Sequence, residues 1–531
     1  MDRPQPQSLF PANLFLIGAT VLGLLLAIVL GAILGESQFT PLLLICLGIG
    51  GVLFAVSLYR YVWQMALFLL FFGFSYRPTS FGFGSLELGC ALGVAVISLF
   101  VWQKRNSDRP AVLDDFSLPF LQRVLFAWLL YVALHAVYNI ASPFRPTEFA
   151  LNNSIKSYFA VSAPLLLFFY FSRTPAGLVV RKDFFWTISK LCLFGLFINI
   201  GVRFYELAIG RYLYIPLIGA TSGLYALRTL GPLAMTIGSV GLTAQAGHKT
   251  PVRFATYWTL LLGGGLGAAF SGGRYALLIG FASVCGVLVL RRKVVALFVV
   301  LVIGIIGAAV ANLSSDWINT KADPIVQRSL QWVLLHKKAE TISNIENSTD
   351  WRRELFHRAI DEWQSDPRIF WTGRATYGFG VADETAILIA GGYEALIRTA
   401  LRRGVTHNLI SDLLVTYGVI GCVLYLLVFC SIIRFLWKAH RSRRLSSPAA
   451  NLALVSFVAS GVHLVYSIIG GNYYPPELVW FLVILLASVY SGAGIEERPK
   501  LALRREKIDP QPVRRPRPVS VGQRPLLQAR D

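Results

Sequence analysis

The stretch VVALFVVLVIGIIGAAVANL, residues 294–313, carries no charged side chain from its first residue to its last. As a helix rising about 1.5 Å per residue, it is long enough to cross the ~30 Å hydrocarbon core of a bilayer. Irregular backbone cannot satisfy its hydrogen bonds in lipid, and the stretch lacks the alternation of a barrel strand. It therefore predicts a transmembrane helix.

Similar apolar runs recur along the whole chain. Hydrophobic residues make up 55% of the 531 residues and charged residues only 15%, whereas a soluble chain of this length would divide into domains with charged surfaces. The first run is too long for a cleavable signal peptide. We predict an all-α, polytopic transmembrane helix bundle of about 14 spans. The predicted spans lie near 13–34, 41–58, 61–75, 85–103, 118–140, 156–173, 184–207, 228–246, 254–271, 275–290, 294–313, 412–436, 449–470 and 476–492.

Lysine and arginine concentrate in alternate short loops, which predicts the orientation because such loops stay in the cytoplasm. The basic set comprises Lys104, Arg105 and Arg109; Arg181 and Lys182; Lys249 and Arg253; Arg291, Arg292 and Lys293; and Lys438, Arg441, Arg443 and Arg444. Both termini are then cytoplasmic, and 314–407 forms a large external loop before the twelfth span. The predicted domains are a bundle of about 11 spans (1–313), this loop (314–407), the last three spans (408–492) and a tail (493–531).

The tail contributes to the net charge of +21 and is rich in arginine and proline between Arg498 and Arg530. It predicts a disordered cytoplasmic segment lying against anionic membrane lipids. No aromatic residues interleave with its arginines, which argues against nucleic-acid binding. All six cysteines fall in apolar spans, so neither a disulfide framework nor a thiolate metal site is expected.

The external loop has the pattern of a folded segment. Apolar residues at helical spacing between Trp351 and Gln364 predict an amphipathic helix, which the Asp366-Pro367 pair should stop. A glycine-punctuated stretch follows, and a second helix is predicted over 384–401. We therefore expect helices that lie on the membrane surface.

The most specific local pattern follows this loop: His407-Asn408, nine residues, then Gly418-Val-Ile-Gly421. It places an imidazole where the loop meets the membrane. Histidine suits proton abstraction because its unperturbed pKa, about 6.5, is near the working pH. The alternative is a surface histidine that contacts lipid headgroups. The two glycines predict close approach of a neighbouring helix.

This pattern, in a protein of many spans, resembles the O-antigen ligase and polysaccharide polymerase family. Three further motifs are similar to that family: Arg228-Thr-Leu-Gly-Pro232, Ser271-Gly-Gly-Arg274, and the progression from Arg352 to the glycines at 373–380. The resemblance covers roughly residues 220–436. The chain departs from the family pattern in the two glycines between Ser271 and Arg274, and in a longer loop.

The resemblance implies a glycosyltransferase that moves a glycan from undecaprenyl diphosphate to an acceptor hydroxyl, inverting the anomeric centre without a metal or other cofactor. The acceptor is a growing glycan, lipid A core or a protein hydroxyl, and the location is the external (periplasmic) face of the bacterial cytoplasmic membrane. Guanidinium suits the diphosphate because it binds phosphate in a bidentate way. The implied residues are His407 as catalytic base; Arg274, Arg228 and Arg211 for the diphosphate; and Asn408, Gly418 and Gly421 as structural motif residues.

Other interpretations remain open at this point. An arginine at a span end also occurs as a snorkelling anchor. Ionisable residues inside spans are functional suspects or satisfied structural pairs, and the sequence has His135, Arg203, Glu206 and His463 in such places. The alternative function is a transporter or flippase of lipid-linked oligosaccharides, although no internal repeat is evident. A structural scaffold for envelope assembly is the third class.

Overall fold

The computed structural model describes the chain from the fifth predicted span onward, with gaps. The described segments are 118–141, 164–169, 171–172, 183–210, 213–215, 219–221, 223–244, 250–273, 275–321, 333–335, 339–374, 400–401, 408–442, 444–470 and 476–490, together with a few single positions. The first four predicted spans (apart from Gln64 and Leu67) and the basic tail lie outside the described residues.

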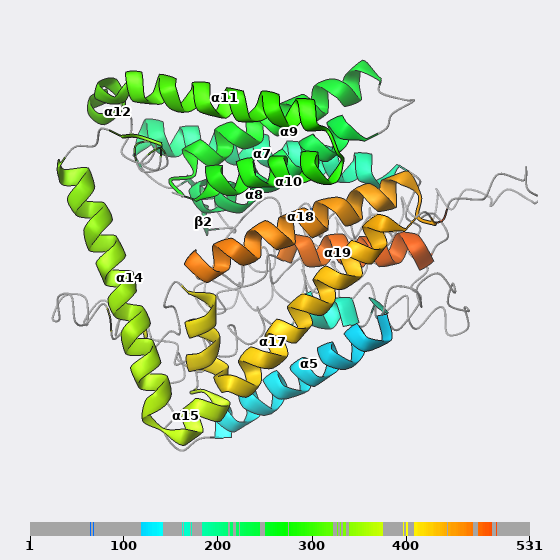
Figure 1. Ribbon diagram of the computed structural model, residues 1–531, viewed down its shortest axis with the longest axis vertical. Coiled ribbons are helices and arrows are strands. Elements are labelled where there is room, and N and C mark those ends of the chain that lie inside the picture. Colours follow the sequence, from blue (N-terminus) through cyan, green and yellow to red (C-terminus); the bar gives the residue numbers. More distant parts are fainter. Residues whose placement is uncertain are drawn as a thin grey trace, which may run out of the picture.

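Helices account for nearly all of the described chain (Figure 1). They are α5 (Leu118–Ala141), α7 (Phe184–Ile209), α8 (Gly223–Thr243), α9 (Pro251–Phe270), α10 (Ala276–Leu290), α11 (Val294–Leu313), α12 (Ser315–Lys321), α14 (Ala339–Ser365), α15 (Pro367–Thr372), α17 (Leu409–Arg441), α18 (Ser447–Gly470) and α19 (Pro476–Tyr490). One short antiparallel hairpin, β1 (Leu213–Ile215) with β2 (Gly219–Thr221), interrupts them. The sequence did not predict it, because three-residue strands are too short to show an alternating pattern.

The long helices form two packed groups (Figure 1). In one, α7, α8, α9 and α10 pack together; in the other, α17 packs against α5 and α18, and α18 against α19. Contacts of α18 with α8 and α10 join the groups. At the α8–α9 crossing, a Cβ on Gly264 would lie 2.7 Å from the Gly231 carbonyl oxygen. Small residues therefore allow these two backbones to touch.

The outward faces of the helices are apolar, as a membrane protein requires. Among the described residues, five helices are long and apolar enough to cross a bilayer: Leu118–Val137, Phe184–Ile209, Val294–Leu313, Leu409–Arg441 and Ser447–Ile468. The spans predicted at 275–290 and 476–492 correspond to shorter apolar helices. On α11 no residue is buried, and Phe298 and Ile305 are about two-thirds exposed. The chain is a polytopic helical membrane protein; the total of about 14 spans stays a prediction.

The predicted loop helix exists and lies across one end of the bundle. Figure 1 shows α14 running transverse to α17 and α18, from the side of α12 to that of α15. As predicted, it ends before Asp366-Pro367, where the Asp366 carboxylate caps α15 by accepting the Arg368 N–H at 2.7 Å. Leu355 and Ala359 of α14 form a small buried cluster with Ile397, Leu401 and Val415. The loop is thus folded onto the start of α17.

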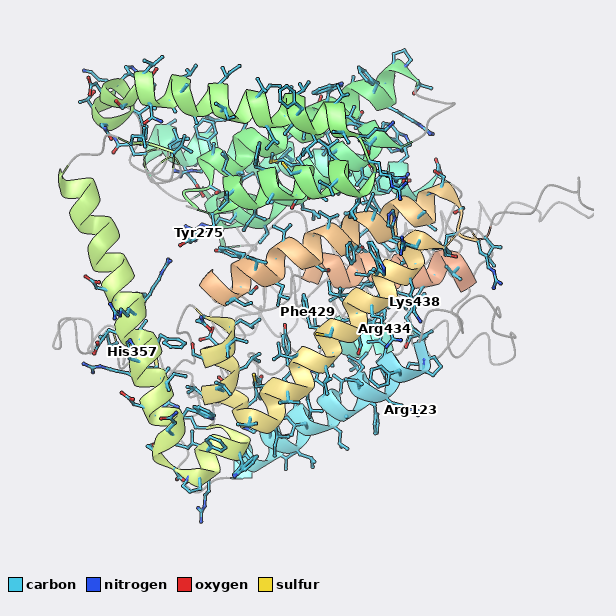
Figure 2. All side chains as sticks on the ribbon, viewed as in Figure 1. Arg123, Tyr275, His357, Phe429, Arg434 and Lys438 are labelled. Atoms are coloured by element: carbon cyan, nitrogen blue, oxygen red, sulfur yellow. The ribbon has the colours of Figure 1, made fainter. Side chains whose placement is uncertain are left out.

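The two ends of the bundle differ in charge. Figure 2 shows Arg123, Arg434 and Lys438 at the end opposite to Tyr275 and to His357 on α14. The cluster at 291–293 follows the end of α10, and the cluster at 438–444 begins in the last turn of α17. This asymmetry agrees with the basic loops of the sequence; which end faces the cytoplasm stays a prediction.

Candidate functional site

The turn between α9 and α10 is tightly built. Ser271 is fully buried, and its hydroxyl donates to the Ala268 carbonyl at 2.7 Å while accepting the Gly273 N–H at 3.2 Å. Gly272 adopts a φ of 62°, in the left-handed region that glycine occupies without steric cost. Ser271, Gly272 and Gly273 thus form a tight turn between the two helices. Arg274, between Gly273 and Tyr275, lies outside the described residues.

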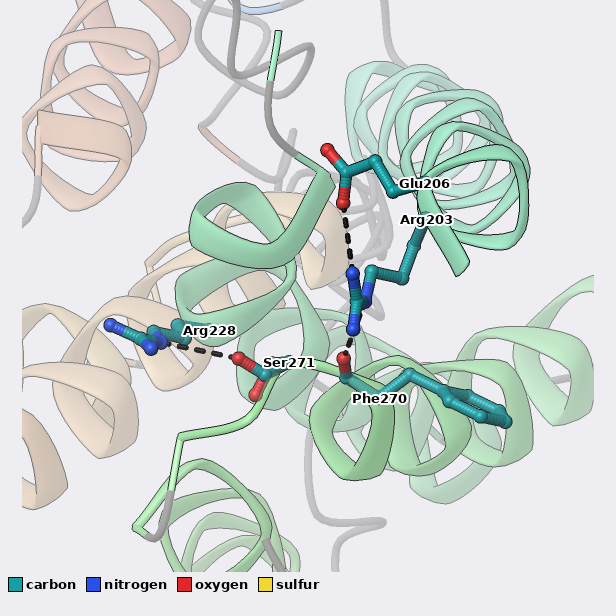
Figure 3. Close-up of polar contacts among 5 residues, drawn as sticks. All are labelled: Arg203, Glu206, Arg228, Phe270 and Ser271. Carbon is teal, nitrogen blue, oxygen red and sulfur yellow. Dashed lines mark hydrogen bonds and ion pairs between the residues drawn. The ribbon is translucent and has the colours of Figure 1, made fainter. Parts of the chain in front are cut away.

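Two arginines from different helices hold the end of α9. Nε of Arg228, on α8, donates to the Ser271 carbonyl at 3.2 Å, and Nε of Arg203, on α7, donates to the Phe270 carbonyl at 3.3 Å. Figure 3 shows the two guanidiniums on either side of this helix end. The last carbonyls of a helix lack intrahelical partners and carry partial negative charge, so cations suit them.

Arg203 is also paired with Glu206, one turn further along α7. Nη1 of Arg203 lies 3.1 Å from the Glu206 carboxylate, and both residues are only 5% exposed. The two intramembrane charges therefore form an ion pair. Arg228, by contrast, is only half-buried.

The loop brings another arginine to the same end of the bundle. Nη1 of Arg352, on α14, lies 3.5 Å from the Tyr275 hydroxyl, and the Tyr275 and Tyr466 rings are 5.6 Å apart. Arg228 and Arg352 both lie close enough to Tyr466 to interact with it electrostatically. Nε of Arg352 is buried and has no hydrogen-bond partner among the described residues. The site therefore gathers two guanidiniums beside the α9–α10 turn.

The sequence motif included Arg352 but did not predict that it binds the diphosphate. Its helical spacing, however, indicates that the side chain faces the bundle. Arg352 shares the face of α14 that carries Leu355 and Ala359, and that face is buried against the bundle. An arginine on an otherwise apolar stripe points inward, where a charge needs a partner.

Asn408 ties the start of α17 to the last turn of α18. Its side-chain oxygen accepts the N–H groups of Ile410 and Ser411, at 2.9 and 3.2 Å, which caps α17. Its side-chain nitrogen donates to the Ile468 carbonyl at 2.6 Å. Asn408 thus fixes the chain beside the helix that carries Tyr466. His407 precedes it and lies outside the described residues, as does Arg211.

Gly418 lies at a close approach between α17 and the loop. Its φ of 65° breaks the helical geometry inside α17, and a Cβ there would lie 2.3 Å from the Trp371 carbonyl oxygen. The close neighbour is therefore the end of α15 in the loop, not another span. Gly421 does face a neighbouring helix, since its Cβ would lie 2.8 Å from the Tyr131 ring on α5.

Residues that follow α15 complete this junction. The Arg374 N–H donates to the Val415 carbonyl at 2.7 Å, on the turn of α17 just before Gly418. Its guanidinium bonds both the Glu362 carboxylate on α14 and the Leu401 carbonyl. Arg374 thereby links the loop helix, the start of α17 and the segment that leads to His407.

A family model described as O-antigen ligase matches residues 258–426. The match includes the α9–α10 turn, Arg352, Asn408 and the glycine junction. Residues 258–426 are therefore similar to the O-antigen ligase family.

The O-antigen ligase family domain indicates glycosyl transfer of the ligase or polymerase type, with a lipid-linked glycan donor and an acceptor at the membrane. Arg228 precedes the matched segment but contacts it through Ser271. No curated protein matches the chain significantly. Within the described part of the chain, no group of three or more histidine, cysteine, aspartate or glutamate residues is arranged to hold a metal ion.

Proposed function

We propose that this O-antigen ligase family protein transfers a glycan from undecaprenyl diphosphate to an acceptor hydroxyl at the external face of the bacterial cytoplasmic membrane. The observation that carries the proposal is the gathering of Arg228, Arg352, the α9–α10 turn and Asn408 at one end of the bundle, beneath α14. That end is the one without the basic clusters, so the positive-inside rule makes it external. Both termini and the tail at 493–531 are then cytoplasmic.

The arginines provide the chemistry that a diphosphate needs. Two phosphates at a membrane interface require fixed cations, and guanidinium offers paired N–H donors in one plane. Arg228 bonds the α9–α10 turn, Arg274 follows Gly273 of that turn in the sequence, and Arg352 reaches Tyr275 beside it from the loop. Arg211, between α7 and β1, is the remaining candidate.

His407 serves as the base. Its imidazole takes the proton from the acceptor hydroxyl as the oxygen attacks the anomeric carbon from the face opposite the diphosphate. The bond between that carbon and the diphosphate oxygen breaks, and the electron pair leaves with the diphosphate. Attack from the opposite face inverts the anomeric centre. The arginines stabilise the charge that develops on the leaving group.

The test is glycan transfer by the purified protein in lipid, with undecaprenyl-diphosphate-linked glycan and an acceptor. We expect a new glycosidic bond and release of undecaprenyl diphosphate. A flippase would move the donor across the membrane without forming that bond, and such a result would refute the proposal.

Transfer should continue unchanged in excess chelator, because guanidinium groups take the place of a divalent cation at the diphosphate. The measurement is the initial rate with and without EDTA, after dialysis to remove bound ions. Loss of turnover that added Mg²⁺ or Mn²⁺ restores would contradict the metal-independent mechanism.

Arg274→Lys should raise the donor KM about tenfold or more, since lysine keeps the charge but loses the bidentate fork. Initial rates over a range of donor concentrations measure this effect. Arg253→Lys, at the opposite end of α9, is the matched control and should leave the rates unchanged. If Arg274→Lys also has wild-type kinetics, Arg274 is an anchor and does not bind the diphosphate.

A further inference from the structure

The Arg203–Glu206 pair lies near the end of α7, and neither residue is proposed to touch the donor. A buried ion pair is weak support for stability, because the cost of removing two charges from water offsets their attraction. In a membrane-spanning helix that cost is high, and intramembrane charges are retained where they have a function. The question is what this pair does.

The contact of Arg203 with the end of α9 suggests the answer. Glu206 fixes the guanidinium of Arg203 through Nη1, and Nε then donates to the Phe270 carbonyl. Arg228 holds the next carbonyl, that of Ser271, from α8 (Figure 3). Two consecutive carbonyls are therefore bonded from two helices, immediately before the residues that lead to Arg274.

The sequence explains why such a clamp is needed. Gly272 and Gly273 have the greatest backbone freedom of any residues, so the chain between Ser271 and Arg274 does not by itself fix where the arginine points. Substituting Gly273 is restricted, since its Cβ would lie 3.1 Å from the Arg228 side chain. The glycines let Arg228 come close. The Ser271 hydroxyl bonds the turn from within, and the bonds from Arg228 and Arg203 fix its place relative to α8 and α7.

We infer that the Arg203–Glu206 pair is a positioning device that orients the α9–α10 turn, and through it Arg274, for the lipid-linked diphosphate. The inference rests on the proposed function, because it assigns Arg274 to the donor. Arg203 itself touches the Phe270 carbonyl and not the substrate.

The experiment replaces both charges together. Arg203→Leu with Glu206→Leu removes the clamp without leaving a lone buried charge, and such apolar replacements are often neutral or stabilising. We expect a thermal unfolding temperature at or above wild type, with a donor KM about tenfold higher because the turn is misplaced. Ser189→Ala, a buried polar change on the other half of α7, controls for substitution in this helix.

Arg203→Lys is the second variant, should the double leucine protein fail to fold. Lysine keeps the ion pair with Glu206 but has no planar fork with which to hold the Phe270 carbonyl at the same time. We expect normal folding and a donor KM raised severalfold. A fully folded variant of either kind with the wild-type donor KM overturns the inference.

Coupling to Arg274 separates this inference from the proposed function. The test combines the double leucine change with Arg274→Lys in one protein. If the pair acts through Arg274, the donor KM of this combined variant is less than about twofold above that of Arg274→Lys alone, because effects of coupled residues are not additive. A donor KM tenfold above that of Arg274→Lys overturns the inference.

The separate variants distinguish the two assignments. If Arg274→Lys is impaired and the pair variant is not, the pair has no positioning role and Arg274 keeps its role. If only the pair variant is impaired, the turn is positioned for another group, and the assignment of Arg274 fails.

Discussion

His407→Ala should lower the rate of glycan transfer by about 10²–10⁴-fold, the usual contribution of a positioned general base. The acceptor hydroxyl is a poor nucleophile until its proton is taken, and Asn408 fixes the chain at the start of α17, directly after His407. The effect should fall on kcat, because the arginines that bind the donor are unchanged. Initial rates and donor binding, measured on the purified variant, separate the two quantities.

The chain offers a matched control for this substitution. His357 is an exposed histidine on α14, the helix that lies across the end of the bundle where α17 begins (Figure 2). Its ring contacts the Phe356 ring. His357→Ala should transfer glycan at the wild-type rate. Equal rates for His407→Ala and wild type would remove His407 from the mechanism, and equal losses in both variants would indicate a general effect on the loop.

Gly418→Ala should abolish most of the activity by a different route. The φ of 65° and ψ of −173° at Gly418 belong to a region that only glycine occupies readily, at a cost of about 1–3 kcal/mol for other residues. The added Cβ would also overlap the Trp371 carbonyl, which is backbone and has little room to move. The end of α15 must then leave α17, and the bond from the Arg374 N–H to the Val415 carbonyl should be lost.

Two measurements check this prediction: the rate of transfer, and the rate at which a protease cleaves the loop in membranes. We expect slower transfer with faster cleavage. Gly461→Ala on α18 is the control, because a Cβ there meets nothing within 4 Å. If Gly418→Ala is as resistant to protease as the control and fully active, the loop junction does not support the site.

The membrane-spanning architecture could be predicted from the sequence because it depends on local composition. An apolar run such as 294–313 needs no tertiary information to be identified as a span. The amphipathic helix of the loop was found in the same way, from the spacing of Leu355 and Ala359. Its start at Ala339 was missed, since the first turns of α14 are polar and carry no apolar period.

The site was predictable only in part, because its geometry comes from contacts between distant segments. Motif resemblance identified Arg228, but its bond to the Ser271 carbonyl depends on how α8 and α9 cross. Likewise, the sequence indicated that Gly418 allows a close approach, but not that its partner would be Trp371 in the loop. Residues far apart in the chain meet there, and a single sequence carries no signal for such pairs.

A structure of the protein with undecaprenyl-diphosphate-linked glycan bound tests the central claim most directly. We predict the diphosphate beside the α9–α10 turn, hydrogen-bonded to Arg228, Arg274 and Arg352, with His407 facing the anomeric carbon from the other side. A diphosphate bound at the opposite end of the bundle, near Arg291 and Lys438, or one held by none of these arginines, would contradict the account.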